Sequence, residues 1–335
     1  MVASVETGDS NVTGTDSTAS TASTAMTAMT TTAPSPTVSP ATAVGRPVRA
    51  LTLGARRYDI GHRALVMGIL NRTPDSFYDR GATFELDELL RRAEQHVAEG
   101  ADVLDVGGVK AGPGPEVSEP EEFDRVVPAI EAITARFDVP VSVDTWRAGV
   151  AAASFAAGAV LGNDISGFAD PDYLQVAEAA GASVVATHIR LAPRVADPEP
   201  RYVDVVATVA GFLVERAARA VAAGLSPDRI VLDAGLDLGK TAAHSLALLR
   251  ASDVLAGLGY PLLLSASNKT FLGVELGLEL TERREASLAA AAMGITLGCR
   301  VLRVHDVAGT VRVRDVLAEI LSARAGEPVP ERQAP

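Results

Sequence analysis

Residues 139–164, VPVSVDTWRAGVAAASFAAGAVLGND, contain one complete unit of a pattern that recurs along the chain. A short apolar run rich in β-branched residues ends at Asp144, a segment of helical length follows, and a second apolar run ends at Asn163. Runs this short and apolar are typical of strands buried on both faces of a parallel sheet. The segment therefore predicts a strand, a helix and a second strand, with a polar residue at the end of each strand.

The same pattern occurs eight times between residue 64 and residue 305. The predicted strands are Ala64–Leu70, Asp102–Val106, Val139–Val143, Val160–Gly162, Ser183–Thr187, Ile230–Leu232, Pro261–Ala266 and Val301–Val304. Eight such units are enough to close a (β/α)8 barrel, the TIM-barrel fold. An open doubly wound sheet is the alternative, but no Gly-x-Gly-x-x-Gly motif follows the first strand.

Glycines mark the loops that lead into the predicted strands. Six of the strands are preceded by a glycine, namely Gly100, Gly158, Gly181, Gly224, Gly259 and Gly298. Glycine readily adopts the left-handed conformation that ends a helix. We therefore expect tight return loops at one end of the barrel. The polar residues after the strands would then share the opposite, C-terminal face, where active sites of this fold lie.

Composition indicates one folded domain between two tails. Residues 1–45 are mostly Ser, Thr and Ala, contain no aromatic residue and have no Lys or Arg before Arg46. Such a segment buries too little apolar surface to offset the entropy cost of ordering it. The sequence therefore predicts a disordered tail at 1–45, a barrel domain at 46–325 and a disordered C-terminal tail at 326–335.

Charge, cysteine content and hydropathy limit the compartment and the partners. The N-terminal segment lacks the basic and apolar regions of a signal peptide, and no apolar run approaches the length of a membrane span. The single cysteine, Cys299, excludes an intrachain disulfide and is expected to be a buried core thiol. A net charge of −12 argues against a broad nucleic-acid-binding surface, although a local cationic pocket for a phosphate is compatible with it. We expect a cytoplasmic protein that acts on small molecules.

Four polar side chains at the predicted strand ends form a candidate binding site. Asp144, Asn163, Asp233 and Lys269 supply two carboxylates, an amide and an ammonium. Together they can accept hydrogen bonds from an amino-pyrimidinone edge and donate to its carbonyl and ring nitrogens. This set indicates a flat, polar heterocycle as the ligand.

A second group surrounds the last predicted strand. Arg303 and His305 alternate along it, so their side chains point to the same face. Together with Asn71 they could hold a phosphate or its metal ion.

Seven motifs in order resemble those of the dihydropteroate synthase family. They are MGILNRTPDSFYD (67–79), GADVLDVGG (100–108), VSVDT (141–145), AGAVLGNDISG (157–167), LDAGLDLGKT (232–241), SNKTFLG (267–273) and RVHDV (303–307). The resemblance runs from about residue 64 to residue 320. It implies a (β/α)8 barrel, usually a homodimer, that joins 6-hydroxymethyl-7,8-dihydropterin pyrophosphate to p-aminobenzoate, the folate-pathway step that sulfonamides block.

The resemblance also implies roles for the matching residues. The pterin would be bound by Asp144, Asn163, Asp233 and Lys269. Pyrophosphate and Mg²⁺ would be held by Asn71, Arg303 and His305, with Asn71 as the metal ligand. The p-aminobenzoate would lie beside Ser267 and Pro113. The residues implied in catalysis are Asp144, Asp233, Lys269, Arg303 and His305.

The second-strand loop departs from the family pattern. Residues 107–114 read GGVKAGPG where the family has Gly-Gly-Glu-Ser-Thr-Arg-Pro-Gly, so Ala111 and Gly112 replace a threonine and an arginine. Three further departures are Asn268, Ala234 and Leu238, in place of an arginine, a proline and an aromatic residue. A charge-assisted hydrogen bond is worth about 1.5–3 kcal/mol, so losing the arginine could cost roughly 10 to 150-fold in affinity or rate. The pterin and pyrophosphate positions are retained, whereas those for the second substrate are not.

Three functions remain open on the sequence. The first is a dihydropteroate synthase with weakened activity, in which Arg72, Arg80 or Lys110 stands in for the lost guanidinium or is an ordinary solvated charge. The second is an inactive paralogue that binds a pterin-like ligand but does not couple p-aminobenzoate. The third is a pterin-binding methyltransferase domain, which would not be expected to keep the Ser267-x-Lys269 and Arg303-Val-His305 elements.

Overall fold

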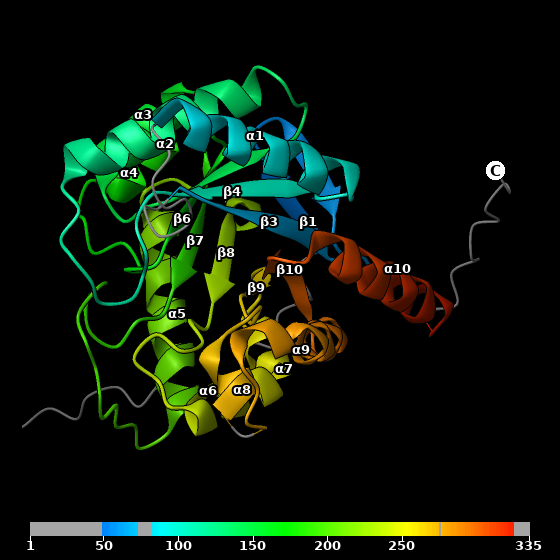
Figure 1. Cartoon of the computed structure of the whole chain (residues 1–335). Helices are drawn as coiled ribbons and strands as arrows, with labels where there is room; N and C mark the ends of the chain where they lie inside the picture. Colours follow the sequence, from blue (N-terminus) through cyan, green and yellow to red (C-terminus); the bar gives the residue numbers. More distant parts are fainter. Residues whose placement is uncertain (1–48, 73–81, 275, 325–335) are drawn as a thin grey trace, which may run out of the picture. The chain divides into compact units, whose positions relative to one another are not determined.

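The computed structural model describes residues 49–72, 82–274 and 276–324, so both predicted tails lie outside the described residues. Eight parallel strands form a closed barrel in the order β10-β3-β4-β5-β6-β7-β8-β9. Their bounds are β3 Leu65–Asn71, β4 Val103–Gly107, β5 Val141–Asp144, β6 Leu161–Asp164, β7 Ser183–Thr187, β8 Ile230–Asp233, β9 Leu262–Leu264 and β10 Cys299–Val304. All eight predicted strands are present, and the prediction of a (β/α)8 barrel is confirmed (Figure 1).

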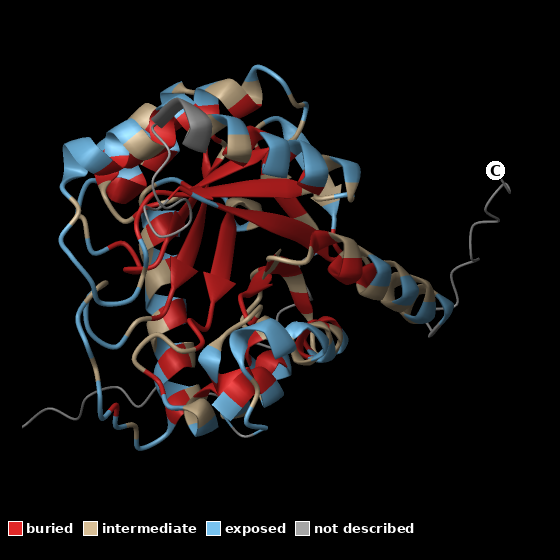
Figure 2. Cartoon of the chain, in the orientation of Figure 1, coloured by how far each residue is buried: buried red, intermediate tan, exposed pale blue. Residues whose placement is uncertain are grey.

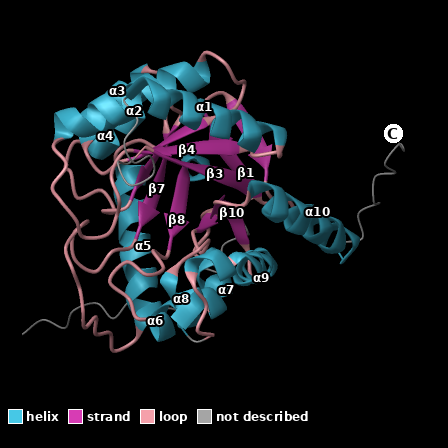
Figure 3. Cartoon of the chain, in the orientation of Figure 1, coloured by secondary structure: helices cyan, strands magenta, loops and turns pink. Residues whose placement is uncertain are grey.

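Helices surround the strands (Figure 3). Their bounds are α1 Ala82–Ala98, α2 Glu119–Thr134, α3 Ala148–Ala156, α4 Tyr173–Ala179, α5 Val205–Ala222, α6 Ala242–Arg250, α7 Ser252–Ala256, α8 Thr270–Val274, α9 Arg284–Thr296 and α10 Val307–Arg324, with 3-10 turns η2 Pro227–Arg229 and η3 Leu280–Glu282. The strands are buried almost throughout, whereas the helices are buried mainly on the side that faces them (Figure 2). None of the helices in the described ranges is long and apolar enough to cross a membrane.

The predicted glycine turns are confirmed. All six glycines have a positive φ, from 62° at Gly181 to 105° at Gly158 and Gly224. A side chain at Gly158 would also meet Thr134, because a Cβ there would lie 3.1 Å from the threonine methyl carbon. The short return loops thus depend on glycine at these positions.

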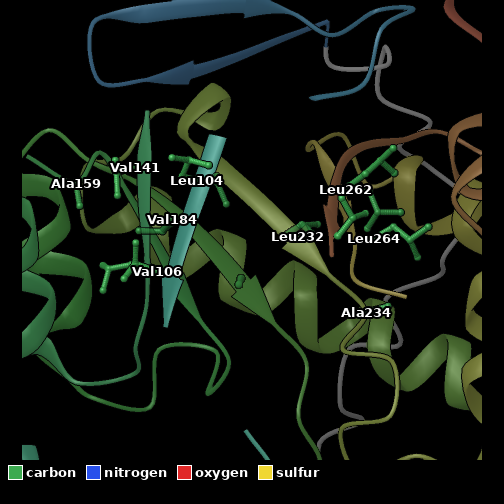
Figure 4. Close-up of a cluster of buried hydrophobic side chains, with 14 of the residues drawn as sticks. Leu104, Val106, Val141, Ala159, Val184, Leu232, Ala234, Leu262 and Leu264 are labelled. Atoms are coloured by element: carbon green, nitrogen blue, oxygen red, sulfur yellow. The ribbon is translucent and has the colours of Figure 1, made fainter. Parts of the chain in front are cut away.

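Two apolar layers hold the barrel together. The outer layer lies between strands and helices and includes Leu104, Val106, Val184, Leu232 and Leu264 (Figure 4). The inner layer fills the N-terminal end of the barrel with residues near the strand starts. Cys299, at the start of β10, is 1% exposed, and burial raises the pKa of its thiol to about 12. The expectation of a buried core thiol is confirmed.

A hairpin that the sequence reading did not predict closes this end of the barrel. Strands β1 (Ala50–Leu53) and β2 (Arg56–Asp59) pair antiparallel, and Leu51, Leu53 and Ile60 pack against the inner apolar layer. The hairpin is also tied to the barrel by the Thr52 hydroxyl, which donates to Asp228 Oδ2 at 2.7 Å. The opposite, C-terminal end is left as the open face of the barrel.

Candidate active site

Four polar side chains form the top inner layer of the barrel. Asp105, Asn163, Asp233 and Arg303 come from β4, β6, β8 and β10, which are alternate strands of the barrel. Each lies two residues beyond an inner apolar residue on its strand. Those residues are Val103, Leu161, Val231 and Val301. Because side chains alternate along a strand, the four polar residues also point inward. A (β/α)8 barrel is normally filled by layers of this kind, and here the layer nearest the C-terminal face is polar.

Arg303 joins two carboxylates inside this layer. Its Nε donates to Asp105 Oδ2 at 2.6 Å, and its Nη2 donates to Asp144 Oδ2 at 2.7 Å. Asn163 Nδ2 donates to the same oxygen of Asp105 at 3.3 Å. Burial lowers the pKa of Arg303, but the two carboxylates raise it by more, so the guanidinium stays charged. The predicted site residues Asp144, Asn163 and Arg303 thus belong to one connected network.

Asp105 is a site residue that the sequence reading missed. It is fully buried, and its Oδ1 accepts no hydrogen bond from the described part of the chain. A buried carboxylate oxygen without a donor is costly, so this atom is suited to accept a hydrogen bond from a ligand. The signal was present in the sequence as a charged residue inside the apolar run of residues 102–106.

Asp233 is the last residue of β8, and Lys269 lies in the loop between β9 and α8. Asp233 Oδ1 accepts the Gly235 backbone N–H at 2.8 Å, and Lys269 Nζ donates to the Leu236 carbonyl at 2.5 Å. Burial raises the pKa of Asp233 and lowers that of Lys269, and each residue opposes the shift of the other. The two predicted residues are therefore electrostatically coupled.

Asn71 lies across Gly107 from Asp144. The three residues are partners in the strand register, with Asn71 beside Gly107 and Gly107 beside Asp144. A Cβ at position 107 would lie 3.4 Å from both Asn71 Oδ1 and Asp144 Cβ. The missing side chain of Gly107 leaves the space between the amide and the carboxylate open.

No group of three His, Cys, Asp or Glu side chains suited to a metal ion occurs among the described residues. Mg²⁺ commonly takes one or two protein ligands and completes its shell with water and substrate phosphate oxygens. Asn71 is exposed, and its amide oxygen fits such a site, in which most ligands come from the phosphates and water.

His305 and Ser267 are hydrogen-bonded to each other. Ser267 Oγ lies 3.0 Å from His305 Nδ1 and accepts the His305 backbone N–H at 3.2 Å. Burial, and then Arg303, lower the pKa of His305 to about 4, so its ring is neutral at pH 7. Ser267 and His305 line a pocket of about 350 Å³ with residues of α9 and α10.

A different pocket contains Pro113 and the substituted positions of the second-strand loop. This pocket of about 240 Å³, called here the loop pocket, is lined by Ala111–Pro113, by Ile189, Leu191, Ala192 and 194–198, and by 237–240. Leu238, which replaces the family's aromatic residue, is part of it. Pro113 lines this pocket, whereas Ser267 lines the pocket beside His305.

Arg72 does not face this pocket and is not a solvated charge. It is 8% exposed, and its Nη1 donates to the carbonyls of Asp124 at 3.3 Å and Arg125 at 2.8 Å, within α2. Pro128 has no N–H to pair with the Asp124 carbonyl four residues earlier, so that carbonyl is free to accept from Arg72. Of the two other candidate cations, Arg80 lies outside the described residues, and Lys110 has an exposed side chain.

The raised pKa of Asp144 predicts that the free energy of unfolding depends on pH. Burial raises its pKa from 3.8 to about 7, against the opposing effect of Arg303. Because the folded pKa lies above the unfolded one, this group's contribution to stability is complete at low pH and is lost as the pH rises through 7. We expect the urea midpoint to fall between about pH 4 and pH 7, and Asp144→Asn to remove part of that slope. The same slope in both proteins would show that Asp144 is ionised throughout.

These features define a class of protein. The described residues form a (β/α)8 barrel with buried carboxylates, an arginine, an amide and a lysine at its C-terminal mouth. A family model described as "Pterin binding enzyme" matches residues 67–305. The chain belongs to this family.

The relatives are dihydropteroate synthases and proteins named as inactive forms. The chain is 46% identical over 286 residues to "Inactive dihydropteroate synthase 2" of Mycobacterium leprae, covering 84% of this chain and 94% of the relative. It is 41% identical to "Dihydropteroate synthase" of Bacillus subtilis, covering 78% and 90%. Among solved structures, the Yersinia pestis dihydropteroate synthase in complex with a sulfonamide drug aligns with a TM-score of 0.76 at 38% identity, covering 82% and 99%. The Xanthomonas albilineans enzyme in complex with 7,8-dihydropteroate aligns with a TM-score of 0.73 at 36% identity, covering 83% and 100%. This chain is dihydropteroate synthase-like.

Proposed function

We propose that this protein binds 6-hydroxymethyl-7,8-dihydropterin pyrophosphate and couples it to p-aminobenzoate only weakly. The observation that supports the proposal is a difference between two parts of the C-terminal face of the barrel, the strand-end network and the second-strand loop. Asp105, Asp144, Asn163 and Arg303 form an intact hydrogen-bonded network. The neighbouring loop has lost its threonine and arginine, at Ala111 and Gly112.

The pterin would lie on the top inner layer of the barrel. Asp105 Oδ1 and Asp233 would accept hydrogen bonds from its N–H groups, while Asn163 and Lys269 would donate to its carbonyl and ring nitrogen. Breaking the C–O bond leaves positive charge on the pterin, which the carboxylates of Asp144 and Asp233 would offset. The amine then attacks the exposed methylene carbon.

The pyrophosphate would lie toward Asn71 and His305. Arg303 Nη1, which has no hydrogen-bond partner among the described residues, could donate to it. The neutral His305 ring could donate from Nε2, because Nδ1 faces the Ser267 hydroxyl. Mg²⁺, held by Asn71 and the phosphates, would supply charge neutralisation of the leaving group when bound.

We further propose a cytoplasmic homodimer that uses helices α9 and α10. These helices pack together and expose Met293, Val316 and Ile320, which are 52%, 60% and 51% exposed. Exposed apolar side chains on adjacent helices are typical of a protein interface.

A second candidate function is a binding protein that has lost coupling altogether. It is supported by the name of the Mycobacterium leprae relative, which calls that protein inactive. Both candidates share the pterin site and differ only at the second substrate.

Restoring the loop separates the two candidates. A side chain can begin at position 112 without a clash, since a Cβ at Gly112 would meet no described atom within 4 Å, so Gly112→Arg is a suitable variant. Together with Val109→Glu, Lys110→Ser and Ala111→Thr, it should raise p-aminobenzoate-dependent product formation by roughly 10 to 100-fold. Because Val109 is only 6% exposed, the set is also made without Val109→Glu, which would bury a carboxylate.

Gly211→Arg is the control, because Gly211 lies on α5, is exposed and also has open space beside it. This variant should leave coupling unchanged. If the loop variants show no activity while pterin binding is intact, the binding protein is the better description.

A further inference from the structure

A pocket at the N-terminal end of the barrel lies apart from the candidate active site. This pocket of about 210 Å³, called here the basal pocket, has Arg49, His62, Tyr260 and Arg300 as its charged and polar lining residues. Arg49 comes directly before β1, and His62 lies between β2 and β3. Tyr260 precedes β9, and Arg300 is the second residue of β10. Because barrel strands start here, the basal pocket lies at the end opposite the strand-end network.

The basal pocket differs in charge from three other pockets of the described chain. The loop pocket contains Asp197, the pocket beside His305 contains Asp306, and a pocket beside the β1–β2 hairpin contains Asp138. No Asp or Glu is found among the described residues that line the basal pocket. The whole chain has a net charge of −12, so a pocket with two arginines and no carboxylate is a local exception. Such a pocket can attract an anion even on an acidic protein.

Arg300 reaches the basal pocket through an irregularity in β10. Residues 299 and 301 pair with the adjacent residues 262 and 263 of β9, so Arg300 is an extra residue in the pairing of the two strands. A bulge of this kind re-aims a side chain that would otherwise follow the alternation of the strand. A charged residue of a barrel strand thus lines a pocket among the return loops.

The guanidinium of Arg300 is half-buried and contacts only neutral groups. Its Nη1 donates to the carbonyls of Ile295 and Cys299, both at 2.9 Å. Its Nε and Nη2 carry three more N–H groups, which have no hydrogen-bond partner among the described residues. Burial lowers the pKa of Arg300, and the neighbouring Cys299 thiol opposes this effect. A half-buried cation without a counter-charge is stabilised by an anion that supplies one.

Arg49 supplies the second guanidinium of the basal pocket. Its stem lies against Gly61, where a Cβ would be 3.7 Å from Arg49 Cγ. The Arg49 side chain is exposed and forms no hydrogen bond or ion pair with the described residues. Asp59 Oδ1 accepts the Gly61 backbone N–H at 2.8 Å, and this carboxylate forms no ion pair within the described chain. Arg49 is therefore available to a ligand.

We propose that the basal pocket binds the phosphate group of a small molecule between Arg49 and Arg300. A guanidinium can donate two parallel hydrogen bonds to the oxygens of a phosphate. A phosphate dianion would offset both positive charges, and the Tyr260 hydroxyl would donate a further hydrogen bond. Inorganic phosphate and phosphate monoesters share this group. Binding here is independent of the proposed function, because the basal pocket shares no residue with the candidate active site.

Calorimetric titration of the full chain with inorganic phosphate tests this assignment. Arg300→Gln and Arg49→Gln should each weaken binding by about 10 to 150-fold, the value of one charge-assisted hydrogen bond. Arg49→Gln changes an exposed side chain, so this variant should fold normally even if Arg300→Gln does not. Glycerol 3-phosphate is titrated in parallel. Tighter binding of this monoester would identify an organic phosphate as the ligand, and tighter binding of inorganic phosphate would identify the free ion.

Arg57→Gln is the matched control. Arg57 is exposed on β2 and does not line the basal pocket, so this variant makes the same change of charge outside it. Phosphate affinity should stay the same in Arg57→Gln. No binding by the unmodified chain would overturn the proposal, and so would an unchanged affinity in Arg49→Gln and Arg300→Gln, which is expected if phosphate binds only near Arg303. Equal affinity for acetate would also overturn it, because the pocket would then not select phosphate.

Discussion

Arg303→Met is expected to lower the free energy of unfolding by about 3–5 kcal/mol and to abolish measurable pterin binding. The substitution leaves Asp105, which is fully buried, and Asp144 without the guanidinium that neutralises both. Removing one partner of a buried ion pair is costly because the other charge stays uncompensated. Urea denaturation and calorimetric titration with dihydropterin pyrophosphate measure the two effects.

Arg314→Met is the matched control for this variant. Arg314 is 4% exposed and pairs with Asp102 at 2.7 Å, at the N-terminal end of β4 and away from the site. Asp102 keeps a second partner, Arg63, at 3.0 Å, so the loss of stability should be smaller. Pterin affinity should not change. Normal stability and binding in Arg303→Met would show that the network is not the basis of the site.

Asp233→Asn is expected to weaken pterin binding by roughly 100-fold, equivalent to about 2.7 kcal/mol. The carboxylate only accepts hydrogen bonds, whereas the new amide would bring two donors toward the N–H groups of the pterin. Calorimetry measures the change in Kd.

Asp164→Asn distinguishes a binding effect from a folding effect. Asp164 is a fully buried carboxylate next to Asn163, and it accepts the backbone N–H groups of Ser166 at 2.6 Å and Phe168 at 2.9 Å. Its substitution should lower stability and spare pterin affinity. Unchanged affinity in Asp233→Asn would remove Asp233 from the site.

The barrel could be predicted from the sequence because each strand and each glycine turn is marked by residues that are close together in the chain. Short apolar runs predicted every barrel strand, and positive φ values confirm the six glycine turns. The predicted Asp144, Asn163 and Arg303 meet in one network because parallel strands end at the same face.

The missed features depend on contacts between distant parts of the chain. Asp105 was read as part of a buried strand, and only its pairing with Arg303, 198 residues away, shows its place in the site. The β1–β2 hairpin has strands of four residues, and its burial comes from the barrel end that it covers. Arg72 lies within the first motif, 67–79, yet its side chain donates to the Asp124 carbonyl that Pro128 leaves free in α2.

The central claim is our proposal that the pterin site is intact whereas the second-strand loop, with Ala111 and Gly112, no longer supports the second substrate. One calorimetric titration of the unmodified chain with dihydropterin pyrophosphate tests it most directly. We expect saturable one-to-one binding per chain, followed by little further heat when 4-aminobenzoate is added to the saturated protein. A folded protein that does not bind the pterin, or that binds 4-aminobenzoate tightly once the pterin is present, would contradict the claim.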